Sequence, residues 1–141
     1  MKVSWGSWIG LAGLIAIVFV VVWPMYGDYT NRSQAAEAVS LLSEAKFPLS
    51  EYFANHDKWP KSLEEVKSST KGKYTQSVVI SKGAGSKGEL ELTATMKSEG
   101  VDRRVTGQSV RLATKDGGRN WVCSPGTMDV KNLPGACRPS N

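Results

Sequence analysis

Acidic residues are missing from the first 27 positions of this sequence, and from Trp5 to Tyr26 there is no charged residue at all. At about 1.5 Å of rise per residue, this run would form a helix of roughly 33 Å, enough for a bilayer core of about 30 Å. A secretory signal has a shorter apolar stretch, about 7–15 residues, followed by small residues. This run ends instead in Trp23-Pro24-Met25-Tyr26. It therefore predicts a retained membrane anchor at residues 1–26, with a removable signal as the alternative.

Cysteine and histidine are also scarce. The chain has two cysteines, Cys123 and Cys137, and a single histidine, His56. These are too few for a Cys/His zinc site, and no Ser or Cys nucleophile with an orienting acid is near His56 in the sequence. We therefore expect no catalytic residue, cofactor, metal or small-molecule substrate, and no enzyme. Beyond a membrane anchor, two cysteines predict a disulfide in an oxidising compartment, with two unpaired buried thiols as the alternative.

Charge is distributed unevenly along the chain. Residues 1–60 hold 4 Lys or Arg and 5 Asp or Glu, whereas residues 61–141 hold 14 and 8. The second part is therefore +6, a charge that attracts anionic surfaces, nucleic acid included. A basic face that is merely solvated is the alternative. The candidate residues for an anionic partner are Arg103, Arg104, Arg111, Lys115, Arg119, Lys131 and Arg138.

Beyond the charge-free run, the pattern predicts an amphipathic second half of one long helix. Apolar residues from Ala35 to Phe53 recur about every 3.5 positions, and polar residues such as Glu37 and Glu44 fall on the opposite face. Pro48 has no N–H for the Glu44 carbonyl, so we expect a bend near Phe47 or a short second helix from there to Asn55. The expected apolar face consists of Ala35, Ala38, Val39, Leu42, Ala45, Leu49, Tyr52 and Phe53.

The period of the pattern then changes from helical to extended. Alternating segments rich in Val, Thr, Ile and Leu are separated by loops that contain glycine, which suits hairpins. We predict an antiparallel meander of four strands with the amphipathic helix packed on one face, an α+β fold. The expected strands are residues 74–82, 89–97, 107–114 and 120–123.

Three ordered segments carry a resemblance to a known family. The segment from Pro24 to Gln34 contains Pro, Tyr, Asp-Tyr and Arg-Ser-Gln in the order found after the membrane helix of type IV pilins. The segment from Tyr52 to Pro60 is similar to that family's helix exit, and Trp121 to Arg138 resembles its C-terminal disulfide loop. Together these segments are spread over nearly the whole chain, which thus resembles a type IV pilin with an atypical N-terminus.

The resemblance implies a structural subunit of a type IV pilus that serves adhesion, twitching motility or surface attachment. Such a subunit lies in the bacterial inner membrane, with residues 27–141 as a periplasmic or extracellular domain, until its apolar helix packs into a filament. Its implied partners are other pilin subunits and the inner membrane. Two alternatives remain: a membrane-tethered accessory that contacts pilins without polymerising, and a DNA-binding minor pilin in natural transformation. DNA or another anionic surface is then a further partner.

The apolar run also contains small residues at helical spacing. Gly6, Gly10 and Gly13 would let two helices approach closely, and Pro24 should kink the membrane part of the helix. A plain anchor, in which these glycines have no role, is the alternative.

The first residues differ from the family pattern. With Pro24 as the reference, the family's glycine before the processing point falls at Lys2 and its acidic residue at Ser7. A serine does not supply the charge that a carboxylate in lipid offers to an ammonium group. A second alignment places the leader cleavage after Gly6. Both alignments favour the accessory alternative.

Overall fold

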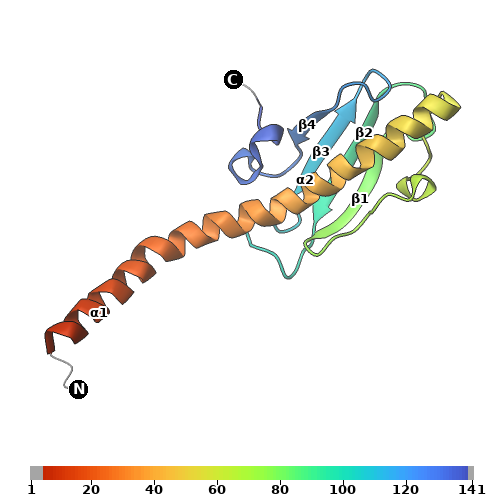
Figure 1. The fold of residues 1–141 in the computed structure, drawn as a ribbon. Coiled ribbons are helices and arrows are strands. Elements are labelled where there is room, and N and C mark those ends of the chain that lie inside the picture. The colour runs from red at the N-terminus through yellow and green to blue at the C-terminus, as the bar shows by residue number, and fades with distance from the viewer. Residues whose placement is uncertain (1–4, 140–141) are drawn as a thin grey trace. The chain divides into compact units, whose positions relative to one another are not determined.

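The computed structural model describes residues 5–139, and the chain divides into two compact units, Met1–Thr30 and Asn31–Asn141. Lys2, at which the sequence places the displaced processing glycine, lies outside the described residues. The domain boundary expected after residue 26 stays a prediction. In chain order the elements are α1 (Trp5–Ile17), the π-helix η1 (Val18–Val22), α2 (Trp23–His56), the 3₁₀ turn η2 (Leu63–Val66), β1 (Thr75–Lys82), β2 (Leu90–Met96), β3 (Ser109–Thr114), β4 (Val122–Pro125), η3 (Val130–Asn132) and η4 (Gly135–Cys137) (Figure 1).

The charge-free run is divided between α1, η1 and the first turn of α2. η1 directly precedes α2, whose second residue is Pro24. Proline offers no N–H to the carbonyl four residues earlier, and a π-helical turn is one way in which a helix adjusts to that gap. The sequence predicts a membrane-spanning first half of a single long helix. Within residues 5–139, no helix combines the length and the apolar character that a bilayer crossing requires.

The second unit contains the predicted antiparallel meander, with the strands side by side in the order β1-β2-β3-β4. Its register pairs Ile80 with Leu92, and Leu92 with Leu112, so that residues of one face lie in rows across the sheet. The observed strands begin or end within two residues of the predicted ranges. The fold prediction is confirmed for the sheet, the helix that covers it and the C-terminal disulfide loop.

The part of α2 in this unit covers one face of the sheet (Figure 1). The predicted apolar face is confirmed, because Ala38, Leu42 and Leu49 are fully buried. They form a common core with every second residue of β2, from Leu90 to Met96. Apolar residues at every second position of the strands therefore pack against apolar residues that recur about every 3.6 positions on the helix. This is the arrangement that a helix packed on a sheet requires.

The short second helix expected from Phe47 to Asn55 is wrong, because α2 continues through Pro48 to His56 as one helix. The bend expected near Phe47 stays a prediction. Ala45 and Leu49, on either side of the proline, are fully buried. This packing holds the helix across the one backbone hydrogen bond that proline cannot make. α2 ends where the sequence predicts, since Asp57 has a positive φ of 56°.

The position of Glu37 on the polar face of the helix predicts that its side chain faces solvent, but the carboxylate forms hydrogen bonds with other parts of the domain. Its Oε1 accepts hydrogen bonds from the backbone N–H groups of Tyr74 (2.8 Å) and Thr75 (3.0 Å), and from the Thr75 hydroxyl (3.0 Å). Its Oε2 accepts from the N–H of Lys73 (3.1 Å). One carboxylate thus joins α2 to the start of β1. The helical pattern could not predict these bonds because their donors lie outside the helix, at residues 73–75.

Candidate functional site

The first candidate surface is the apolar side of α1 and η1. The large apolar side chains that are described on these two elements are all exposed, from 41% at Val22 to 73% at Val20. A helix that is apolar all round belongs in an apolar environment, either lipid or the interior of a larger assembly. The surface consists of Trp8, Ile9, Leu11, Leu14, Ile15, Ile17, Val18, Phe19, Val20, Val21 and Val22, and Trp23 extends it.

The three glycines of the apolar run lie in α1. A Cβ atom added at Gly6, Gly10 or Gly13 would meet no other atom within 4 Å. Their spacing of four and then three positions places them along one side of a helix. They therefore form a smooth strip on α1 that is open to a partner helix, and the packing role predicted for them and the kink predicted at Pro24 stay predictions.

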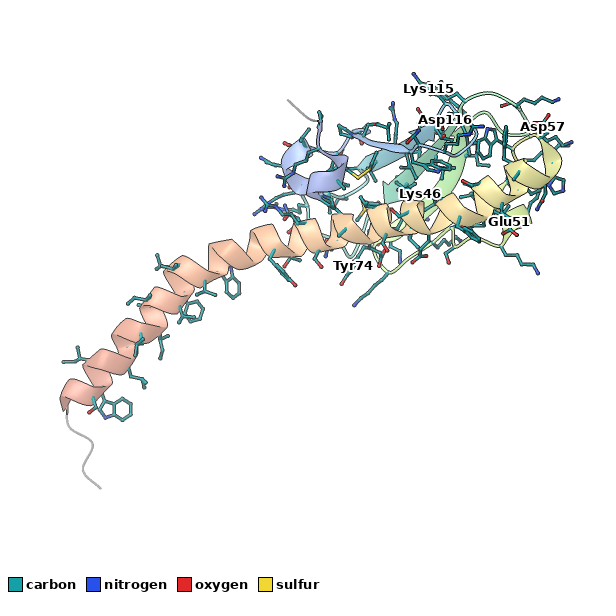
Figure 2. All side chains as sticks on the ribbon, turned by 45° about the horizontal axis from the view of Figure 1, so that its top comes forward. Lys46, Glu51, Asp57, Tyr74, Lys115 and Asp116 are labelled. Atoms are coloured by element: carbon teal, nitrogen blue, oxygen red, sulfur yellow. A yellow bond between two sulfur atoms is a disulfide. The ribbon has the colours of Figure 1, made fainter. Side chains whose placement is uncertain are left out.

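A second candidate surface lies on α2, opposite its buried face. Phe47 is 75% exposed although it belongs to the folded domain. Glu44 precedes it by three residues and Glu51 follows it by four, so the two carboxylates lie one turn to either side. Figure 2 shows Glu51 on the outer side of α2, away from the sheet. The exposed Phe47 ring between two acidic residues is therefore an apolar spot on a charged surface.

The disulfide predicted from the two cysteines is confirmed. Cys123 of β4 is bonded to Cys137 of η4, with their Cα atoms 4.7 Å apart. Cys137 is fully buried, and Leu112, which pairs with Cys123 across the sheet, belongs to the same core. The bond therefore closes the C-terminal loop onto the end of the sheet.

A buried amide pair holds the same loop to α2. The Nδ2 group of Asn31 donates to Oδ1 of Asn132 over 2.7 Å, and the two residues are only 2% and 3% exposed. The two residues are separated by 101 positions, so sequence reasoning had no signal for this contact. Nδ2 of Asn132 also donates to the Arg104 carbonyl over 3.5 Å. The loop, the start of α2 in this unit and the β2–β3 connection therefore meet at Asn132.

The seven predicted basic residues are all exposed, but they fall on either side of β3. Arg103 and Arg104 precede that strand, whereas Lys115 and Arg119 follow it. A strand of this length spans roughly 20 Å. Arg111 lies within β3 itself, opposite Thr93 and Ser124. The set therefore divides into a group before β3, a group after it and one residue between them.

Lys131 and Arg138 join the group that precedes β3, together with Arg32, which sequence reasoning missed. Nε of Arg32 and Nη2 of Arg138 both donate to the Lys131 carbonyl, over 3.3 and 3.4 Å. Nε of Arg138 also donates to the Leu133 carbonyl over 2.9 Å. Two guanidinium groups thus lie beside one another at the C-terminal loop. Arg32 was not foreseen because it precedes the predicted sheet by more than forty residues.

The β3–β4 turn forms the opposite end of the domain, where α2 ends; Figure 2 shows Lys115, Asp116 and Asp57 there. Asp116 accepts from the backbone N–H of Asn120 (2.9 Å) and from its side-chain amide (2.7 Å). These two bonds, the backbone one first, lower the pKa of Asp116 from 3.8 to about 2. The same turn packs against α2, where Phe53, Asp57 and Asp116 line one shallow hollow. Asp116 is thus a turn-forming carboxylate.

The described residues offer little for metal chemistry. Within residues 5–139, no group of three or more His, Cys, Asp or Glu side chains could hold a metal ion. His56 is exposed at the end of α2, where its ring stacks on Tyr52 at 4.0 Å and its Nδ1 lies 3.0 Å from the Tyr52 carbonyl. Its contacts are those of a helix terminus.

Comparison with known proteins supports a role in assembly. A family model described as "Pilin (bacterial filament)" matches residues 31–138. The chain is 39% identical over 129 residues to the fimbrial protein EcpC of Eikenella corrodens, an alignment that covers 89% of this chain and 82% of that protein. It is 32% identical over 150 residues to the type IV major pilin protein PilE of Neisseria gonorrhoeae, covering 89% of this chain and 86% of that protein. A fimbrial protein of Neisseria meningitidis serogroup A is 33% identical over 153 residues, with the same two shares.

Proposed function

This chain belongs to the type IV pilin family, and from that premise we propose that it is a structural pilin subunit whose N-terminal apolar helix forms the contacts of a filament. Adhesion, twitching motility and surface attachment are the roles that such a filament serves. The relatives are described as major pilins and fimbrial proteins, which favours a filament subunit over a non-polymerising accessory or a DNA-binding minor pilin.

One observation carries the proposal: the large apolar side chains described on α1 and η1 are exposed rather than buried within their own unit. Leu14 and Ile15 are 63% and 51% exposed. Transfer of each side chain from water to an apolar environment would lower the free energy. Transfer of such a helix from lipid into a bundle of identical helices leaves the polarity of its surroundings unchanged. Packing along the Gly6–Gly13 strip would then decide association.

We further propose that the unassembled subunit resides in the bacterial inner membrane through residues 1–26, with its C-terminal domain in the periplasm. The charge-free run supports this proposal, since it supplies apolar length for a bilayer even though it is divided between α1, η1 and the first turn of α2. The disulfide supports an oxidising compartment for the domain.

Charged substitutions in the two units test the proposal. Leu14→Arg places a cation on the apolar helix, and Val122→Arg places one at an equally exposed position of β4, where Val122 is 66% exposed. We expect Leu14→Arg to abolish filaments, measured by electron microscopy and by mass spectrometry of sheared fibres, because the cation is costly in lipid and in an apolar bundle. Val122→Arg should leave filaments in place.

Wild-type filaments from the Leu14→Arg variant, at wild-type protein levels, would contradict the proposal. The mass of the N-terminus in purified fibres adds an independent test, since cleavage would leave Val3 or Ser7 as the first residue. A chain that retains Met1 and is absent from sheared fibres would instead support the accessory alternative.

A further inference from the structure

Five cations gather at the end of the domain where the C-terminal loop meets the start of α2 in this unit. We call them the Arg32 cluster: Arg32, Arg103, Arg104, Lys131 and Arg138. Arg32 and Arg138 donate to the same carbonyl, that of Lys131. Arg104 lies beside the same loop, because its carbonyl accepts a hydrogen bond from the side chain of Asn132, the residue after Lys131. Arg103 is the exposed neighbour of Arg104.

The backbone that carries the cluster is held by buried contacts. Asn31 donates to Asn132 with both residues almost fully buried, and the Cys123–Cys137 disulfide closes the loop that carries Lys131. The N–H of Arg32 also donates to Oδ1 of Asn31 over 2.9 Å. The cations are therefore presented from an ordered base, which lowers the entropy lost when they bind a ligand.

The cluster keeps an excess of positive charge after its internal ion pairs. Among the described side chains, Asp102 lies 4.0 Å from Arg104, and Asp129 lies 3.7 Å from Lys131. Arg32, Arg103 and Arg138 form no ion pair with a described side chain, and the Lys131 side chain remains 73% exposed. Guanidinium groups are planar forks of N–H donors that suit phosphate oxygens. The geometry thus favours a ligand that presents phosphate groups at a surface.

Only a short stretch of chain separates Arg32 from the apolar run. Arg32 follows Tyr26, the last residue of the charge-free run, by six positions, a distance of about 9 Å along a helix. That is close to the Debye length of about 8 Å at physiological salt, within which a charged surface still attracts cations. Lys115 and Arg119, by contrast, lie on the far side of β3.

We propose that the Arg32 cluster binds the phosphate groups of anionic phospholipids at the surface of the bilayer that holds the N-terminal unit. The inference rests on the membrane residence proposed above. A lipid surface fits better than duplex DNA, because five cations form a compact group and the remaining basic residues do not extend it into a continuous stripe. A protein that makes about 6–10 phosphate contacts with DNA needs more cations than these five.

The test compares two double variants that remove the same charge. Arg103→Gln with Lys131→Gln removes two cations of the cluster and spares the guanidinium bonds of Arg32 and Arg138. Lys115→Gln with Arg119→Gln removes two cations at the other end of β3. The full chain, in neutral detergent, is mixed with vesicles of phosphatidylcholine alone or with added phosphatidylglycerol. Flotation then measures the bound fraction, and the ratio between the two vesicle types is the preference for anionic lipid.

We expect the wild type to prefer the anionic vesicles at low salt and to lose this preference at high salt. The cluster variant should reduce the preference roughly tenfold or more, and the Lys115/Arg119 variant should keep it. Equal thermal unfolding midpoints of the variants confirm that the domain is intact.

If both variants lose the preference for anionic vesicles equally, net charge alone explains the binding and the proposal is overturned. If the wild type shows no preference for anionic vesicles, the proposal is overturned outright. Gel shifts with duplex DNA add a second arm. Strong DNA binding that depends on Arg103 and Lys131, without a preference for anionic lipid, would show that the ligand of the Arg32 cluster is nucleic acid and not a lipid surface. Failure to enter even neutral vesicles would contradict the membrane residence and, with it, this inference.

Discussion

Trp8 and Trp59 are the same side chain in two units of one chain, yet Trp8 is 64% exposed and Trp59 is 1% exposed. Trp59 has a complete set of partners, since its Nε1 donates to the Gly88 carbonyl over 2.8 Å and its ring lies 4.4 Å from that of Phe53. The contrast extends to the units around them. Within the described residues, no buried side-chain polar atom lacks a hydrogen bond, whereas the apolar face of α1 and η1 is uncovered.

The comparison indicates where each unit obtains its stability. The buried polar and apolar groups of the folded domain have their partners within the domain. The N-terminal unit leaves its apolar surface to be completed by lipid or by other copies. Substitutions in the domain should therefore change the free energy of unfolding, and those in the N-terminal unit should change partition and assembly.

The largest expected difference separates the two tryptophans. Trp59→Ala should lower the free energy of unfolding of the domain by about 3–5 kcal/mol, because it empties a buried site and leaves the Gly88 carbonyl without its donor. Trp8→Ala should change it by less than about 0.5 kcal/mol. Urea unfolding of the detergent-solubilised chain, followed by the near-ultraviolet signal, measures both. Similar losses in the two variants would show that the N-terminal unit contributes to the folding of the domain.

The disulfide comes next. Replacing Cys123 and Cys137 by serine should cost about 3 kcal/mol, because the unfolded chain regains the freedom that the closed loop removes. We also expect the Arg32 cluster to lose order, since the loop between the cysteines carries Lys131. Unfolding under reducing conditions should match the double variant. Equal unfolding curves for the wild type and the serine variant would mean that the core alone holds the C-terminal loop.

The sequence was most informative where one local pattern determined the contact. The helical period identified Ala38, Leu42 and Leu49 as core residues, and alternation located the strands. It was least informative about long-range polar contacts. The Asn31–Asn132 pair spans 101 positions, and a surface-like asparagine gives no local sign of its partner. The second helix expected after Pro48 was wrong for a related reason, since burial of Ala45 and Leu49 outweighs one lost backbone bond.

A substitution at Glu37 should have an intermediate effect on the free energy of unfolding. Glu37→Gln should destabilise the domain by about 1–3 kcal/mol, because a neutral amide replaces a carboxylate that accepts from three consecutive backbone N–H groups. Glu44→Gln, at an exposed position on the same helix, is the matched control and should have little effect. Hydrogen exchange of the Tyr74 and Thr75 amides locates the change. If these amides stay as protected as in the wild type, Glu37 is not what joins α2 to β1.

The smallest expected effect concerns Asp116, whose pKa is lowered to about 2 by the Asn120 backbone and side-chain donors. Because the folded state has the lower pKa, the stabilisation is present above the unfolded value of 3.8 and is lost as pH falls through about 2. The difference in unfolding midpoint between the wild type and Asp116→Asn should thus be constant above about pH 5 and narrow below it.

Asn120→Ala provides the control for Asp116, because it removes the side-chain donor and keeps the backbone one. The pKa of Asp116, followed by nuclear magnetic resonance of its carboxyl carbon, should rise in this variant while staying below the ordinary value. An unchanged pKa would assign the shift to the backbone of the turn alone. Since the turn lies within the domain, neither variant should alter filament yield, and a loss of filaments would show that this end of the domain also takes part in assembly.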